Sequence, residues 1–322
     1  MNRSEPVPPS LEELSFLAPP DEVCDWRMVV VHDAAAQAGL LARLAASPAT
    51  PAELAADLGL DGHTVRVVLE ELAVWDVVAS DGAGRFAPGT GWPSHEASAA
   101  LRHHARAIRA WSAGIDDRLR GVGPPPERKL PPWTDLWLEA LAVRARHAAP
   151  AIVDACLTRY PEIRRALELG GGHGEYGLEL ARRQVEVTMV DRPGVIDIVR
   201  PRLEQADIVL HAGDFFEALP AGPFDLVLCA GVTHTYGAEG NRALFRRAAT
   251  VLAPEGALAI LTYLRGRDPM APIFAVQMLM AASGADTHAE DDYRAWLGEA
   301  GFGKVEIADD AHPRESLLLA TR

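Results

Sequence analysis

A glycine-rich segment at 170–177 is the first place in this sequence where residue types and spacing favour chemistry. It reads GGGHGEYG, between an apolar run and an amphipathic one, and Gly172, Gly174 and Gly177 form a G-x-G-x-x-G pattern. Glycine lets the backbone turn tightly and approach a ligand closely, and a helix that starts there offers unsatisfied N–H groups. The pattern predicts a nucleotide-binding loop and leaves the nucleotide open.

Acidic residues around this loop narrow the choice of ligand. Asp191 lies 19 positions after Gly172 (191 minus 172), where a carboxylate accepts the ribose hydroxyls of NAD or of S-adenosylmethionine. Glu168 precedes the glycines inside an apolar run. Burial of a carboxylate is unfavourable without a partner, and the ammonium group of a ligand would provide one. The alternative for Glu168 is a strand-end carboxylate that faces solvent.

A third segment, GDFFEALP, follows another apolar run. Asp214 and Phe215 in this segment would place an acceptor for an adenine amine beside an aromatic face. The alternative is a turn residue next to a core phenylalanine. Together with Glu168, this segment favours S-adenosylmethionine over a dinucleotide.

The elements that must position these residues are short apolar runs that alternate with helical patterns after residue 160. Such alternation predicts an α/β fold with a doubly wound parallel sheet, whose ligand lies at the carboxyl ends of the strands. Two final runs lack a crossover helix between them, which predicts a terminal antiparallel hairpin. The expected strands are RALELGG, EVTMVD, IVLHAGD, FDLVLCAG, GALAILTYL, KVEIADD and ESLLLATR.

The chain before this sheet divides into three parts. Residues 1–24 hold five prolines within the first 20 positions and predict a loosely ordered arm. Residues 25–98 predict a winged helix, with a capping box from Thr50 to Glu53, a second helix and a hairpin around 81–84. Residues 99–160 are expected to form connecting helices and a proline-rich linker, and residues 161–322 the sheet domain.

Charge and cysteine usage bound the partners of the protein. The formal net charge of -14 and the acidic surroundings of Arg66 on the second helix disfavour nucleic acid and anionic membranes, so dimerisation is the expected use of the winged helix. Cys24, Cys156 and Cys229 lie far apart in no metal-ligand spacing, which favours a reducing cytoplasm. No signal-peptide pattern and no run of 18 apolar residues was found.

Four motifs in order, behind a winged helix, resemble a known family. ELGGGHGEYG, VDRPGVID, GDFFEALP and VTHTYGAEGNRALFRRAATVLAPEGALAI are similar to the S-adenosylmethionine-dependent O-methyltransferases of the caffeate and hydroxyindole type, including their bacterial natural-product relatives. The resemblance covers residues from about 28 to 322. It implies a Rossmann-like class I methyltransferase sheet of seven strands with the last one antiparallel, a homodimer through the N-terminal domain, and cofactor contacts at Gly170, Gly172, Asp191, Asp214 and Phe215.

His234 stands where the resembling enzymes carry their catalytic base. A histidine suits that task because its unperturbed pKa of ~6.5 leaves it available near neutral pH. The family usually reads His-Asp-Trp there, whereas this chain reads His234-Thr235-Tyr236, so the neighbouring carboxylate that would orient the imidazole is missing. A substrate-positioning or structural histidine is the alternative.

The acceptor cavity of the resembling enzymes is lined by the helix that reads MAPIFAVQMLMAAS here. Phe274 and Met278 on this helix are four positions apart and share a face, in a cavity wall or in an ordinary core. Trp133 and Trp137 are expected to roof the site or to pack a domain interface. His288 could pair with His234 on a metal, as in keto-acid C-methylating relatives of the family. Against this, Thr287 and Glu290 form a capping box that places His288 in the exposed first turn of a helix ending at Gly301, so no metal is expected.

The expected function is methyl transfer to a hydroxyl of a small, aromatic or polyketide-like secondary metabolite. The alternatives are N- or C-methylation, or a non-methylating descendant that uses the same cavity for cyclisation or decarboxylation. A ligand-sensing DNA-binding regulator and a dehydrogenase are the rivals from other classes, the first opposed by the acidic winged helix and the second by Glu168.

Overall fold

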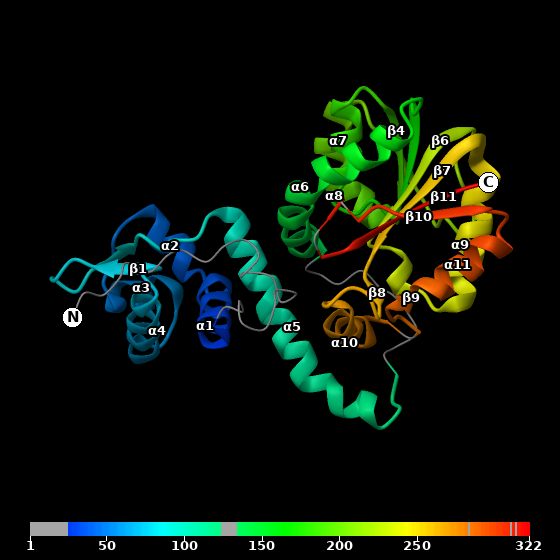
Figure 1. Cartoon of the computed structure of the whole chain (residues 1–322). Helices are drawn as coiled ribbons and strands as arrows, with labels where there is room; N and C mark the ends of the chain where they lie inside the picture. Colours follow the sequence, from blue (N-terminus) through cyan, green and yellow to red (C-terminus); the bar gives the residue numbers. More distant parts are fainter. Residues whose placement is uncertain (1–24, 124–133, 283, 310, 313) are drawn as a thin grey trace. The chain divides into compact units, whose positions relative to one another are not determined.

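The computed structural model describes residues 25–123, 134–282, 284–309, 311–312 and 314–322 (Figure 1). The chain divides into two compact units, Met1–Ser112 and Ala113–Arg322. The expected arm at 1–24 and Trp133 lie outside the described residues.

The first unit is helical with one small hairpin. Thr50 accepts a hydrogen bond from the N–H of Glu53 at 3.2 Å, and the Glu53 carboxylate accepts one from the N–H of Thr50 at 2.8 Å, which confirms the predicted capping box. The short strands pair antiparallel, as predicted. The elements are α1 (Trp26–Gln37), α2 (Leu40–Ala46), α3 (Pro51–Leu58), α4 (Gly62–Val74), β1 (Val78–Ser80), β2 (Phe86–Pro88) and α5 (His95–Leu119), which continues past Ser112.

Apolar residues at helical spacing bury the inner faces of this unit. Val65, Leu69 and Leu72 of α4 are almost fully buried and pack with residues of α2, α3 and the hairpin into one core cluster. Among the described residues no single helix combines the length and apolarity of a membrane span; only α1 and α2 taken together, bent by 71°, reach them.

The second unit is built around a seven-stranded sheet. Its strand order is β10-β11-β7-β6-β3-β4-β5, with β5, β4, β3, β6 and β7 parallel and with β11 antiparallel to both β7 and β10. The strands are β3 (Arg165–Leu169), β4 (Glu186–Asp191), β5 (Val209–Ala212), β6 (Phe224–Ala230), β7 (Leu252–Thr262), β10 (Lys304–Ile307) and β11 (Ser316–Thr321). The predicted α/β fold with a terminal antiparallel hairpin is confirmed.

Helices cover both faces of this sheet (Figure 1). α6, α7 and α8 pack on one face in one core cluster, whereas α9 and α11 pack on the other. The remaining elements are α6 (Thr134–Arg159), α7 (Glu175–Arg182), α8 (Pro193–Leu203), η2 (Glu204–Ala206), η3 (Thr233–Thr235), α9 (Ala238–Val251), β8 (Leu264–Arg265), α10 (Ala271–Ala281), β9 (His288–Ala289) and α11 (Glu290–Glu299).

The order of the strands fixes where a ligand can approach. β3 lies between β4 and β6, and the chain leaves its carboxyl end on one side to form α7 while η3 and α9 follow β6 on the other. This reversal of direction is the switch point at which open α/β sheets bind ligands. The glycine loop, Asp191 and His234 all follow strands at this edge.

Candidate functional site

The glycine loop is a close-packed turn in which side chains have no room. Gly170 has φ +65°, and a Cβ built on it would lie 2.7 Å from Cγ2 of Val232. A Cβ on Gly171 would lie 2.8 Å from Cδ of Glu168. The loop therefore requires glycine both for its left-handed backbone and for its close approach to the neighbouring strand ends.

Glu168 is buried beneath this loop, and no hydrogen bond of normal geometry joins its carboxylate to a described residue. Its side chain is 1% exposed, and neither carboxylate oxygen has a partner within the described part of the chain. Burial disfavours the charged form and the nearby charge of Asp191 adds to this, while the nearby N–H of Gly177 acts in the opposite direction; the pKa of Glu168 rises to about 8. The solvent-facing alternative for Glu168 is wrong.

Asp191 ties the loop to the end of β4. Its carboxylate accepts hydrogen bonds from the N–H groups of Gly172 at 2.8 Å and Arg192 at 2.7 Å. Burial raises the pKa of Asp191, while these N–H groups act in the opposite direction. Gly172 and Asp191, predicted from separate motifs, are therefore in direct contact.

Asp214 and Phe215 follow β5 and are positioned differently from each other. Asp214 is exposed, and its carboxylate accepts a hydrogen bond from the N–H of Phe216 at 2.7 Å, so its described contacts are those of a turn residue. Phe215 is buried, and its ring lies 3.7 Å from where a Cβ of Gly170 would stand. The aromatic face therefore reaches the glycine loop.

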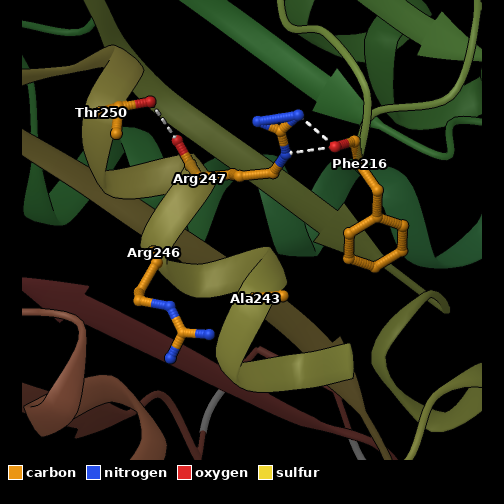
Figure 2. A pocket seen from close by; sticks show the side chains of 5 residues that line it. All are labelled: Phe216, Ala243, Arg246, Arg247 and Thr250. Carbon is orange, nitrogen blue, oxygen red and sulfur yellow. Dashed lines mark hydrogen bonds between the residues drawn. The ribbon is translucent and has the colours of Figure 1, made fainter. Parts of the chain in front are cut away.

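Arg247 of α9 anchors the turn after β5 that contains Asp214, Phe215 and Phe216. Figure 2 shows its guanidinium donating hydrogen bonds to the carbonyl oxygen of Phe216, at 2.7 Å from Nε. Phe216 and Arg247 line a shallow hollow together with Ala243, Arg246 and Thr250. The hollow contains none of the predicted site residues, so we assign the arginine to anchoring the turn.

His234 lies in η3, directly after β6. It is 7% exposed, and its ring packs edge-on against Phe274 of α10 with 4.5 Å between the ring centroids. Phe274 in turn contacts Tyr263, at 4.7 Å between centroids, where β7 ends. Met278, one turn further along α10, is buried as well. The described contacts thus bring Phe274, one of the two predicted cavity residues of α10, onto the predicted base.

Trp137 was predicted to roof the site or to pack a domain interface. It is half-buried and packs on the core cluster that α6 and α7 form on one face of the sheet.

His288 was predicted to lie in an exposed first helical turn, and this prediction is wrong. It belongs to β9, it is half-buried against Trp296, and its Nε2 donates a hydrogen bond to the carbonyl oxygen of Tyr236 at 2.9 Å. α11 begins two residues later than expected, because Asp292 rather than Glu290 caps it through the N–H of Ala289.

Metal binding has no support from the described residues. Within them no group of three or more histidine, cysteine, aspartate or glutamate side chains is arranged to hold an ion. His288 is instead occupied by the carbonyl oxygen of Tyr236.

Several residues around the site were missed by the sequence analysis. Glu175, the first residue of α7, is 3% exposed and forms ion pairs with Arg146 of α6, at 3.0 Å, and with Arg202 of α8. Tyr293 of α11 shares a hydrogen bond of 2.7 Å with the hydroxyl of Thr233. Their partners come from distant parts of the chain, and no local pattern indicates such pairs.

The arrangement fits a nucleoside ligand that carries an ammonium group. Glu168 offers an unpartnered carboxylate for the ammonium, and Phe215 offers an apolar face for a base. The Asp191 carboxylate already accepts two backbone N–H groups, and its remaining lone pairs can accept ribose hydroxyls. In the first turn of α7 the N–H of Glu175 donates to Nδ1 of His173 at 3.1 Å, and the N-cap residue Gly174 has no side chain to cap the N–H groups that follow.

The comparisons with known proteins agree with this geometry. Residues 147–303 match the sequence model of the O-methyltransferase domain. The chain is 27% identical over 168 residues to the 3-hydroxy-5-methyl-1-naphthoate 3-O-methyltransferase of Streptomyces sahachiroi, a match that covers 49% of this chain and 48% of that one. The chain matches about half the length of such curated relatives.

Solved structures share the fold over almost the whole chain. Human N-acetylserotonin methyltransferase in complex with SAM superposes with a TM-score of 0.73 at 20% identity, over 92% of this chain and 94% of that one. N,N-8-amino-8-demethyl-D-riboflavin dimethyltransferase from Streptomyces davawensis gives a TM-score of 0.72 at 21% identity, over 92% and 96%.

Residues 147–303 therefore belong to the O-methyltransferase domain family. The solved structures confirm the predicted class I fold, and the match of residues 147–303 agrees with the predicted S-adenosylmethionine-dependent methyltransferase.

The crowding around Glu168 leads to a test on two helical glycines. A Cβ on Gly177 of α7 would lie 2.6 Å from Oε2 of Glu168, whereas a Cβ on Gly298 of α11 meets nothing within 4 Å. Alanine favours a helix over glycine by about 1 kcal/mol. We expect Gly298→Ala to raise the free energy of unfolding by about that amount, and Gly177→Ala to lower it, because the carboxylate must move. Urea denaturation measures both; equal stabilisation of the two variants would show that Glu168 has free space.

Proposed function

We propose that this protein transfers a methyl group from S-adenosylmethionine to a hydroxyl of a small aromatic or polyketide-like acceptor, with His234 as the general base. The observation that carries the proposal is the unpartnered, buried carboxylate of Glu168 beneath the glycine loop. A buried carboxylate without a hydrogen bond is costly unless a ligand supplies a partner. The ammonium group of S-adenosylmethionine supplies one, and NADH offers no ammonium group to it.

The residues of the chain have distinct tasks in this reaction. Glu168 and Asp191 bind the ammonium and ribose of the donor, Gly170 and Gly172 allow its close approach, and Phe215 covers its base, with Asp214 as the predicted acceptor for the adenine amine. Bound S-adenosylmethionine supplies a methyl group already activated on sulfonium. His234 accepts the proton of the acceptor hydroxyl as the new O–C bond forms and the S–C bond breaks.

The acceptor side is proposed to lie around His234 on α10. Phe274 and Met278 would line this cavity, with Trp137 and Trp133 as further predicted lining residues. The relative from Streptomyces acts on a hydroxynaphthoate by its name, which supports a flat aromatic acceptor. A neighbouring structure is named as a dimethyltransferase of an amino group, and this observation keeps N-methylation as the second candidate.

We also propose that the first unit is a winged helix used for homodimerisation rather than for DNA binding. On α4, Arg66 is paired with Glu70 at 2.7 Å, and this acidic neighbour reduces the positive charge that phosphate contact requires. Exposed apolar side chains gather where α1 begins and α4 ends: Trp26 is 62% exposed, Val74 75% and Trp75 37%. A second copy of the chain would cover them.

Cofactor binding gives the first test, because Glu168 should lose its proton when an ammonium group binds. With a pKa of about 8, Glu168 is mostly protonated at pH 7 in the free protein, so binding should release about one proton and affinity should rise with pH up to about 8. Calorimetry with S-adenosylmethionine and S-adenosylhomocysteine, in buffers of different ionisation enthalpy, measures the release.

Two controls complete this titration. Glu168→Gln should bind both ligands at least ten times more weakly and without proton release, and NADH should not bind to either protein. Binding of NADH, or of neither adenosyl ligand, would mean that the glycine loop has been misinterpreted.

Substitution of the base tests the chemical step. With 3-hydroxy-1-naphthoate and N-acetylserotonin as probe acceptors, His234→Asn should lower kcat by about 10²- to 10⁴-fold, the usual contribution of general-base catalysis. The affinity for S-adenosylhomocysteine should stay within about twofold of wild type, since His234 is not assigned to the cofactor. Release of S-adenosylhomocysteine measures turnover, and an unchanged kcat would remove His234 from the reaction.

The dimer can be tested at its proposed surface. Val74→Asp places a charge on the exposed apolar cluster and should convert the dimer into a monomer in sedimentation equilibrium. Val209→Asp on β5, at a residue 62% exposed in the second unit, is the matched control and should leave the dimer intact. A monomeric wild-type protein at micromolar concentration would contradict the proposal.

A further inference from the structure

The turn that carries His234 has little hydrogen bonding of its own. η3 is a single turn of 3₁₀ helix, closed by bonds from the N–H of Thr235 to the carbonyl of Val232 at 3.0 Å and from Tyr236 to Thr233 at 3.2 Å. Such short turns have poor hydrogen-bond geometry and depend on their surroundings. The position of the His234 backbone must therefore be fixed from outside.

Asn241 of α9 supplies the main external contacts to this turn. Its side-chain amide donates to the carbonyl oxygens of Thr233 and Tyr236, both at 3.0 Å, and to that of Gly237 at 3.3 Å. The first of these carbonyls precedes His234 and the others follow it. One amide group with two hydrogens thus joins both ends of the turn.

The choice of asparagine at this position is costly for stability alone. Asn241 is fully buried, and within the described residues its side-chain oxygen has no hydrogen-bond partner. An apolar residue would avoid that cost in a helix packed on a sheet. The chain contains two asparagines, and the other is Asn2 near the N-terminus.

Other elements hold the same turn at different atoms. The N–H of Asp286 donates to the carbonyl of His234 at 3.0 Å, and His288 donates to the carbonyl of Tyr236 at 2.9 Å. The hydroxyl of Thr233 meets Tyr293 at 2.7 Å. Asn241 differs from these groups because it alone among them contacts carbonyls on both sides of His234.

We propose that Asn241 is a positioning residue for His234. Its amide fixes the backbone on both sides of the histidine and so sets the direction in which the imidazole meets the acceptor hydroxyl. This takes over the orienting task that a carboxylate after the histidine has in the resembling enzymes and that Thr235 cannot perform. The inference rests on the proposed function of His234 as the base.

The test compares two substitutions of Asn241 by a spectroscopic and a kinetic measurement. Asn241→Leu keeps the side-chain volume but removes the N–H donor. Asn241→Ser keeps a hydroxyl donor on a shorter side chain, and it serves as the test variant if the leucine variant does not fold. In protein labelled with ¹³C-histidine, the ring signal of His234, assigned through His234→Asn, should shift and broaden in both variants. We expect kcat for the probe acceptors to fall about 10- to 100-fold, as small misplacements of catalytic groups do, with KM changed less than threefold.

A matched control separates positioning from loss of stability. Ala248→Gly, at a buried residue on the same helix, destabilises α9 without touching the turn, and should leave the His234 signal and kcat unchanged. The affinity for S-adenosylhomocysteine should stay the same in all folded variants. An unmoved His234 signal in a folded Asn241 variant, or an equal change in Ala248→Gly, would overturn the proposal. Absence of S-adenosylhomocysteine binding and of methyl transfer in the wild type would instead refute the proposed function, while the His234 signal would still report on the contact.

Discussion

The burial of one unpartnered carboxylate is the constraint around which the rest of the site is organised. Glu168 lies inside β3, an interior strand of the sheet between β6 and β4, and the missing side chains of glycines 171 and 177 leave space for its carboxylate. Because water is excluded, the carboxyl group holds its proton at neutral pH, as its pKa of about 8 indicates. A cationic ligand bound to the Glu168 carboxylate would recover the free energy that its burial costs. Ligand binding would therefore also stabilise the folded protein.

The other site residues lie at the ends of neighbouring strands and contact the glycine loop from there. Asp191 ends β4 and binds the loop through Gly172, and Phe215 follows β5 and reaches Gly170. Arg247 then holds the turn of Phe215 from α9, and the ion pairs of Glu175 hold the start of α7. Because the ends of these parallel strands lie at one edge of the sheet, residues from separate sequence motifs come close together in the fold.

The sequence predicted the framework well and the support of the site poorly, for a physical reason. Apolar runs such as EVTMVD in β4 and the capping box at Thr50 are local signals, since the residues that interact are neighbours in the chain. Asn241, by contrast, contacts a turn that precedes its own helix. In the sequence it is indistinguishable from any polar residue on a helix. His288 was wrongly expected to be exposed, because the capping pattern at Thr287 competes with one at Ala289 and Asp292, and only packing against Trp296 decides between them.

Orientation of the candidate base is divided between backbone and ring contacts. Asn241 fixes the main chain on both sides of His234, which sets the direction of its Cα–Cβ bond but not the rotation of the ring. Phe274 meets that ring nearly at a right angle, 85°, and so restricts the rotation. Because α10 also carries the expected acceptor cavity, an acceptor that displaces Phe274 would turn the imidazole as well. In the proposed reaction, acceptor shape and proton removal would thereby be coupled, and a well-fitting acceptor would complete the orientation that the backbone contacts begin.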